Sequence, residues 1–67
     1  MNYQVSKAYK GYYQVSIEGF ENCFTVENLN GRWVLKDSSF YIVEFYSTKK
    51  EAVKVAKIML AEAFNNM

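Results

Sequence analysis

The pair Asn30-Gly31 is the feature that most constrains the fold of this 67-residue chain. Asn and Gly both tolerate a positive φ, so this pair is the preferred centre of a type I′ turn. The sequence therefore predicts a β-hairpin, and the turn fixes which residues lie opposite each other in its two strands. The expected pairs are Leu29 with Arg32, Asn28 with Trp33, and Val26 with Leu35.

A turn at Glu18-Gly19 predicts a second hairpin, which shares its later strand with the first hairpin. The expected pairs are Ile17 with Phe20, Val15 with Asn22, and Tyr13 with Phe24. Both turn assignments place Phe24 and Val26 on one face of the shared strand, together with Trp33 and Leu35. A slip of one residue in either hairpin would break this agreement, because side chains alternate between the faces of a sheet.

The two ends of the strand region are less constrained by their turns. The letters Tyr-Gln-Val-Ser occur at residues 3–6 and again at 13–16, and a turn at Lys10-Gly11 would pair the two copies. The sequence leaves open whether residues 1–10 form an edge strand or a loose arm. A turn at residues 37–39 precedes a last strand, 40–46, in which we expect Tyr41, Val43 and Phe45 to face the helix.

The segment Ser47–Phe64 predicts one amphipathic helix. It begins with a capping box, in which the Thr48 hydroxyl accepts from the backbone N–H of Glu51 and the Glu51 carboxylate accepts from that of Thr48. Apolar residues then recur on one face at helical spacing. They are Ala52, Val53, Ala56, Met59, Leu60, Ala63 and Phe64.

The opposite face of this helix carries Lys50, Lys54 and Lys57. These lysines are interpreted as a solvated helix face, with an anion-binding stripe as the alternative. Ile58 lies near them as an exposed apolar residue, and it is the first candidate on the helix for a contact with a partner.

These elements predict an α+β fold, in which an antiparallel meander of three to four strands carries one C-terminal helix on one face. Residues 1–67 are expected to form a single domain. A chain of this length buries only about 60% of its unfolded surface, so a partner or a second copy would add to its stability.

The composition removes most catalytic chemistry. The chain has no His, which is the commonest general base and metal ligand, and its single Cys23 has neither a His partner nor a second Cys. Its glycines fall at separate turns instead of one phosphate-binding loop, and its carboxylates are scattered. We therefore expect no enzymatic activity, no small-molecule substrate, and no catalytic, cofactor-binding or metal-binding residues.

The charge and hydropathy patterns indicate whether nucleic acid or a membrane is an expected partner. The net charge is only +1, from eight basic and seven acidic residues, whereas nucleic-acid binders usually have a clear basic excess. No signal peptide begins at Met1, and no apolar run of about 18 residues could span a bilayer. A single Cys fits a reducing compartment. The expectation is a soluble, cytoplasmic protein without a membrane partner.

The helix opening Phe45-Tyr46-Ser47-Thr48-Lys49-Lys50-Glu51-Ala52, preceded by strands, resembles the arm-type DNA-binding domain of phage and transposon tyrosine recombinases. With Gly31-Arg32-Trp33-Val34-Leu35, it also resembles a group of small bacterial domains. The resemblance covers about the second half of the chain and implies three strands followed by a helix. In the recombinases the sheet enters the major groove of DNA. Here the face expected to point away from the helix carries two basic and four acidic residues, which is the wrong sign for phosphate contacts.

We therefore expect a small non-enzymatic protein-binding module, such as a phage or mobile-element protein that blocks or regulates a host factor. Its partner would be another protein or a second copy of the chain, bound through apolar residues on the exposed sheet face. The alternative is a nucleic-acid-binding accessory domain that uses Lys49, Lys50, Lys54 and Lys57. The residues expected to contact a protein partner are Tyr12, Val34, Phe40, Ile42 and Tyr46 on the sheet and Ile58 on the helix.

Overall fold

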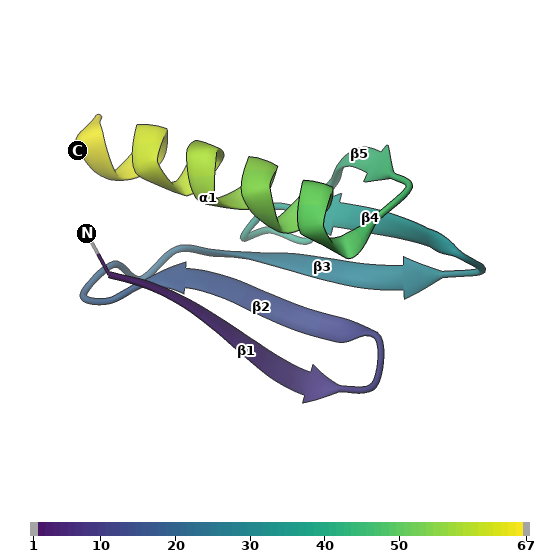
Figure 1. Cartoon of the computed structure of the whole chain (residues 1–67). Helices are drawn as coiled ribbons and strands as arrows, with labels where there is room; N and C mark the ends of the chain where they lie inside the picture. The colour runs from purple at the N-terminus through teal and green to yellow at the C-terminus, as the bar shows by residue number, and fades with distance from the viewer. Residues whose placement is uncertain (1, 67) are drawn as a thin grey trace.

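A computed structural model describes residues 2–66 and shows one antiparallel sheet with a helix packed against it (Figure 1). The sheet is a meander in which each strand pairs with the next along the chain. The elements are β1 (Tyr3–Tyr9), β2 (Tyr12–Ile17), β3 (Cys23–Leu29), β4 (Arg32–Lys36), β5 (Ile42–Tyr46) and α1 (Lys49–Asn65). The α+β class is confirmed, with five strands in place of the three to four expected.

The hydrophobic core lies between α1 and one face of the sheet, here called the inward face. Helix α1 packs against β2, β3, β4 and β5, whereas β1 extends beyond the strip that the helix covers (Figure 1). The opposite face of the sheet is called the outward face. The buried core residues are Val15, Ile17, Phe24, Val26 and Leu35 from the sheet and Ala52, Ala56 and Leu60 from the helix.

The β3–β4 hairpin has the register that Asn30-Gly31 predicts. All three expected pairs are present, and Asn30 and Gly31 have φ values of 54° and 87°. The side chain of Asn28 adds a contact, because its Oδ1 accepts a hydrogen bond of 3.0 Å from the backbone N–H of Gly31. The residues of the turn therefore determine the register of this hairpin.

The β2–β3 register differs from the prediction by two residues. Val15 lies opposite Phe24, not Asn22, because residues 18–22 form a longer connection than the two-residue turn expected. The ring of Phe20 packs edge-on against that of Phe64 in α1, with 5.4 Å between centroids, so Phe20 contacts the core from this connection instead of from a strand. A shift of two residues preserves which face each side chain occupies, so the predicted inward residues remain inward.

The N-terminal residues form an edge strand. The Lys10-Gly11 turn folds β1 onto β2 with Gly11 at φ 77°, and the two Tyr-Gln-Val-Ser copies lie antiparallel with Val5 opposite Val15. The structure thus settles the alternative that the sequence left open in favour of a fifth strand.

Helix α1 begins two residues later than the predicted segment, with Thr48 as its N-cap. The Thr48 Oγ1 accepts a hydrogen bond of 3.2 Å from the backbone N–H of Glu51, which confirms that half of the capping box. Three of the predicted apolar positions, Ala52, Ala56 and Leu60, are buried. They are small or unbranched at the Cβ atom, which lets the helix approach the sheet closely.

Candidate functional site

The predicted orientation of the last strand is correct at its start and wrong at its end. Ile42 pairs with Lys36 on the outward face, as expected. An irregularity in the β4–β5 pairing then reverses the alternation, so that Phe45 pairs with Val34 on the outward face and Tyr46 pairs with Trp33 on the inward face. The expected inward position of Phe45 and the expected outward position of Tyr46 are therefore both wrong.

Tyr46 belongs to the edge of the core instead of the exposed patch. It is half-buried and packs against the core cluster. Burial is the main cause that raises the pKa of its phenol above the ordinary value, and the nearby carboxylates of Glu44 and Glu51 act in the same direction. This position removes Tyr46 from the surface that was predicted to contact a partner.

Val34 lies on the outward face, as predicted, but it is not exposed. Its exposed fraction is 0%, although no helix covers that side of the sheet. Val34 lies between Glu27 and Phe45 in a row of cross-strand neighbours. Beside it, Glu27 Oε1 and Lys36 Nζ are 3.6 Å apart, and the aliphatic parts of long charged side chains can shield apolar neighbours from water. The expectation that Val34 is an exposed residue of the outward face is therefore wrong.

Tyr12 is half-buried and lies on the far side of the outward face from β5. Its ring stacks on that of Tyr9, with 4.8 Å between centroids. Partial loss of solvent around the Tyr9 phenol, followed by the charge of Glu27, raises the pKa of this phenol above its ordinary value. Strands β3 and β4 separate this tyrosine pair from β5. The six predicted contact residues therefore do not form one continuous surface.

One predicted region does remain exposed, and it is larger than expected. The hairpin turn before β5 and the strand itself carry five large exposed apolar residues, which we call the β5 edge patch. They are Phe40, Tyr41, Ile42, Val43 and Phe45. Two of the six sequence-predicted residues, Phe40 and Ile42, belong to this patch. Tyr41, Val43 and Phe45 were missed because regular alternation would have turned them toward the helix.

Polar groups beside the β5 edge patch lie at the outer backbone edge of β5. β5 is the last strand of the sheet, so its outer backbone edge is not paired with a strand among residues 2–66. The backbone N–H of Phe45 donates a hydrogen bond of 3.0 Å to Oε1 of Glu44. The Arg32 guanidinium lies 4.9 Å from the centroid of the Phe45 ring. Glu44 thus occupies a donor at an edge strand, which is one way in which proteins limit unwanted strand pairing.

The turn that presents this patch is held by Asp37. The Asp37 Oδ1 accepts hydrogen bonds of 2.9 Å from the N–H of Ser39 and 3.1 Å from the N–H of Tyr41. Phe40 lies between these two residues with φ 65°, a left-handed conformation that is uncommon for a bulky side chain. A strained, exposed aromatic residue adds little to stability and is typical of a residue retained for a contact.

We expect Phe40→Gly to raise the free energy of unfolding by about 0.5–1 kcal/mol, because Gly adopts a positive φ without a Cβ clash. The exposed Phe40 ring has little packing to lose. Chemical denaturation checks this value, with Phe40→Ala as the control that removes the ring and keeps the Cβ. A Phe40→Gly variant less stable than Phe40→Ala would show that the left-handed conformation carries no cost.

Ile58, the predicted contact residue on the helix, is exposed, as expected. It borders a groove between α1 and β1, together with the four lysines that the alternative, nucleic-acid-binding reading of the sequence would use. Tyr3 and Val5 from β1 complete this groove. The sequence did not identify them, because the strand character of residues 1–10 was open.

The remaining features of residues 2–66 concern metal binding, the single cysteine and membrane-spanning helices. This part of the chain contains no group of three His, Cys, Asp or Glu side chains arranged to hold a metal ion. Cys23 is half-buried, and its Sγ accepts a hydrogen bond of 2.9 Å from Nε2 of Gln14. Within the same residues, no helix has the length and apolar character needed to cross a membrane.

Comparisons of the chain with protein-family models, curated proteins and solved structures found no match.

Proposed function

We propose that this chain is a small protein-binding module that contacts its partner through the β5 edge patch. The single observation that supports this most is the concentration of five large exposed apolar residues within residues 40–45, on one strand and its turn. Apolar side chains gathered on a surface are typical of an interface, and aromatic residues are enriched in interface cores. A role as an inhibitor or regulator of a host factor fits the small size of the chain.

The proposed occupant is an extended segment of another protein, which pairs with β5 as an additional strand. Such strand addition needs an open sheet edge for affinity and exposed side chains for specificity. The edge of β5 offers backbone groups, while Ile42 and Phe45 offer apolar contacts on the outward face. A Lys or Arg in the incoming strand would pair with the Glu44 carboxylate once that side chain leaves the Phe45 N–H.

A second copy of the chain is a poorer occupant of this edge. Glu44 is the central residue of β5, so antiparallel pairing of two β5 strands about their centres would bring two Glu44 carboxylates together. Like charges directly opposite each other in a sheet are destabilising. The proposal therefore favours a heterologous partner.

Nucleic-acid binding is the second candidate function, because Lys49, Lys50, Lys54 and Lys57 gather at one groove. Lysines that neutralise phosphates would make such binding weak and strongly dependent on salt. The groove also has an apolar floor, which nucleic-acid backbones do not need.

The test compares Ile42→Glu with Ile58→Glu, which is a matched control. Ile42 is 55% exposed in β5 and Ile58 is 51% exposed on α1, so both variants add one charge without emptying the core. Tagged wild-type chain and both variants are used to capture proteins from a lysate, and each captured protein is quantified by mass spectrometry. For a partner that uses the β5 edge patch, the captured amount should fall about tenfold or more with Ile42→Glu and remain unchanged with Ile58→Glu.

Circular dichroism and melting temperature show whether each variant keeps its fold. The proposal would be contradicted if no captured protein is lost with folded Ile42→Glu and retained with Ile58→Glu.

A further inference from the structure

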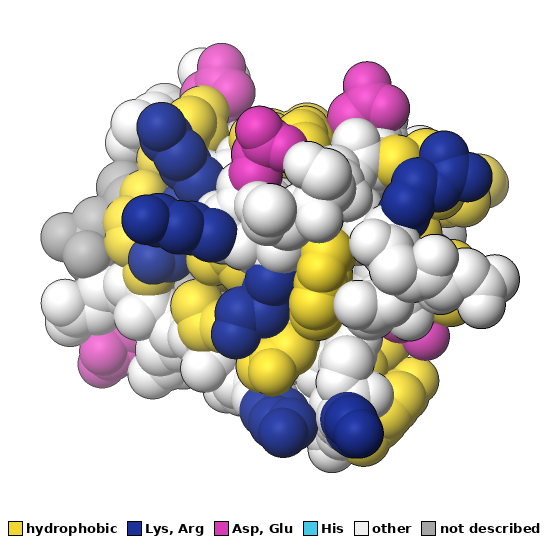
Figure 2. Space-filling model, turned by 45° about the vertical axis from the view of Figure 1, so that its right-hand side comes forward, with side chains coloured by type: hydrophobic (Ala, Val, Ile, Leu, Met, Phe, Trp, Pro, Cys, Tyr) yellow, Lys and Arg dark blue, Asp and Glu magenta, His cyan; other side chains and the backbone are white. Residues whose placement is uncertain are grey.

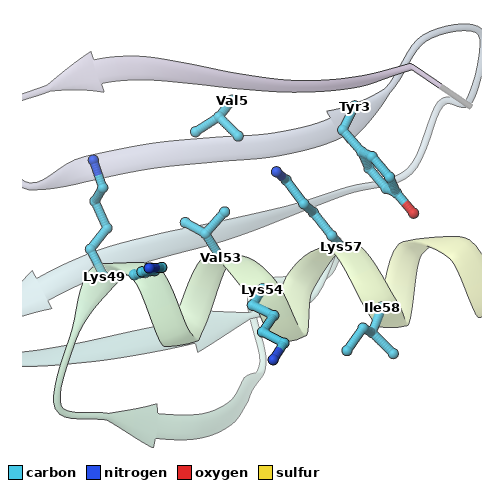
Figure 3. Close-up of a pocket in the computed structure, with 8 residues that line it drawn as sticks. Tyr3, Val5, Lys49, Val53, Lys54, Lys57 and Ile58 are labelled. Carbon is cyan, nitrogen blue, oxygen red and sulfur yellow. The ribbon is translucent and has the colours of Figure 1, made fainter.

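The groove between α1 and β1 is a second surface with its own chemistry. It has a volume of about 470 Å³ and is open to solvent along the helix. Figure 3 shows Lys49 and Lys57 reaching from α1 toward the strands, while Lys54 and Ile58 point away from β1. The lining residues are Tyr3 and Val5 from β1 and Lys49, Lys50, Val53, Lys54, Lys57 and Ile58 from α1.

The groove exists because one helix is too narrow to cover five strands. Strands lie about 4.8 Å apart, so the first and fifth strands are separated by about 19 Å, whereas a helix with its side chains is about 10–12 Å wide. Helix α1 covers the middle of the sheet, and the inward side chains of Tyr3 and Val5 remain exposed beside it. The uncovered strip is therefore apolar and has room for one further element alongside α1.

The charge around this strip has a single sign. Four lysines line the groove, and none of its lining residues described by the structure is acidic. Two of the lysines are held in place by aromatic rings, since Lys49 Nζ is 4.1 Å from the Tyr13 centroid and Lys57 Nζ is 5.6 Å from the Tyr3 centroid. Figure 2 shows Lys and Arg side chains next to exposed hydrophobic side chains on one face of the molecule, where some Asp and Glu side chains also lie. The N-terminus of α1 adds further positive potential at Lys49 and Lys50.

We propose that this groove binds an acidic amphipathic helix of another protein. The apolar side of that helix would pack on Tyr3, Val5 and Val53, and its flanking Glu or Asp residues would pair with Lys54 and Lys57. Helix-in-groove binding requires an apolar floor for the anchor residues, and complementary charge at the rim guides association. This site is separate from the β5 edge patch, so it does not depend on the function proposed above.

Two other occupants fit the groove less well. The α1 helix of a second copy would bring its own lysines against these four, and the repulsion between like charges opposes that arrangement. A nucleic-acid strand would satisfy the lysines, but it would leave Val5, Val53 and Ile58 without an apolar partner. The acidic amphipathic helix is the occupant that uses both the floor and the rim.

The test measures fluorescence anisotropy with a labelled synthetic peptide of about 15 residues, the length at which an isolated helix becomes marginally stable. This Leu/Glu peptide carries Leu at helical spacing on one face and Glu beside it. One control peptide keeps the Leu residues and replaces each Glu by Gln, and another keeps the Glu residues and replaces each Leu by Ser. A labelled oligothymidine is titrated in parallel. The full chain is used as wild type, as the double variant Lys54→Glu, Lys57→Glu, and as Val5→Asp.

The matched control for charge is the double variant Lys10→Glu, Arg32→Glu, which makes the same change in net charge at exposed residues outside the groove lining. We expect the Leu/Glu peptide to bind wild type about tenfold more tightly than either control peptide. The groove double variant and Val5→Asp should each weaken this binding about tenfold, whereas the Lys10, Arg32 variant and Ile42→Glu should change it less than about threefold.

Three results would overturn the proposal. The first is equal binding of all three peptides, and the second is unchanged binding of the Leu/Glu peptide to folded groove variants. The third is oligothymidine binding that is tighter than peptide binding and is lost with the groove variants, which would assign the site to nucleic acid. Sedimentation of the wild-type chain alone adds a fourth check, because self-association abolished by the groove variants would assign the groove to a second copy.

Discussion

Replacing Leu35 with Ala is expected to lower the free energy of unfolding by about 2–5 kcal/mol, the usual cost of truncating a fully buried Leu. Leu35 is completely buried and lies in β4, in the core that the sheet forms with α1. A 67-residue domain has a total stability of roughly 3–10 kcal/mol, so this one change could remove most of it. Urea denaturation followed by circular dichroism measures the difference.

Leu29→Ala is the matched control for this prediction. It is the same substitution at the end of the neighbouring strand, where the Leu side chain is exposed. Its cost should stay within about 0.5 kcal/mol, as for most surface substitutions. Equal losses for Leu35→Ala and Leu29→Ala would contradict the assignment of Leu35 to the core.

Val34→Asp is expected to destabilise the chain by about 3–5 kcal/mol, because it places an unpaired carboxylate at a fully buried position. The ion pair between Glu27 and Lys36 lies beside this position, and the new carboxylate would compete with Glu27 for Lys36. The effect should therefore be partly relieved in the double variant Val34→Asp, Glu27→Gln. Thermal melting of the two variants provides the comparison.

The control for Val34→Asp is Ile42→Asp, the same new charge at an exposed residue on the same face of the sheet. Its melting temperature should remain close to that of the wild-type chain. A Val34→Asp variant that melts like Ile42→Asp would mean that Val34 is open to water, which would restore it as a contact residue.

The local features of this fold were predictable from the sequence wherever one turn or cap determines the geometry. Asn30-Gly31 determines the β3–β4 register, and Thr48 with Glu51 determines the helix start, because the hydrogen bonds involved join residues close in the chain. The inward face of the sheet followed from the agreement of two turns. This assignment of inward residues remained correct despite a two-residue error in the β2–β3 register, because a shift by an even number of residues leaves each side chain on the same face.

The features that were not predictable depend on contacts between distant residues. Phe20 packs on Phe64 from a β2–β3 connection that is longer than predicted, and no local pattern reports a contact between residues so far apart in the chain. Phe40 adopts a positive φ that propensity would assign to Gly. The pairing irregularity that follows reverses the orientation of Phe45 and Tyr46.

The dependence on contacts between distant residues also explains which residues of the candidate site were predicted from the sequence. The sequence identified Phe40 and Ile42 as exposed. Regular alternation at the start of β5 explains Ile42, whereas Phe40 is exposed in the turn before the strand. It placed Val34 among the exposed contact residues, because alternation reports which face a residue occupies and does not report whether neighbouring side chains cover it. The lysines of the groove were evident from helical spacing, whereas Tyr3 and Val5 required the position of β1.

The central claim, that a protein partner binds at the β5 edge patch, is tested most directly by photo-crosslinking from Tyr41. A photoreactive phenylalanine derivative replaces either Tyr41, which is 72% exposed in the patch, or Tyr9, which is 60% exposed on β1. Both positions exchange one exposed aromatic ring for another, so the fold is not expected to change. We predict that illumination in lysate joins a defined protein to the Tyr41 probe and not to the Tyr9 probe, and that Ile42→Glu abolishes this crosslink. A defined product from the Tyr9 probe alone, or a Tyr41 product unaffected by Ile42→Glu, would contradict the claim.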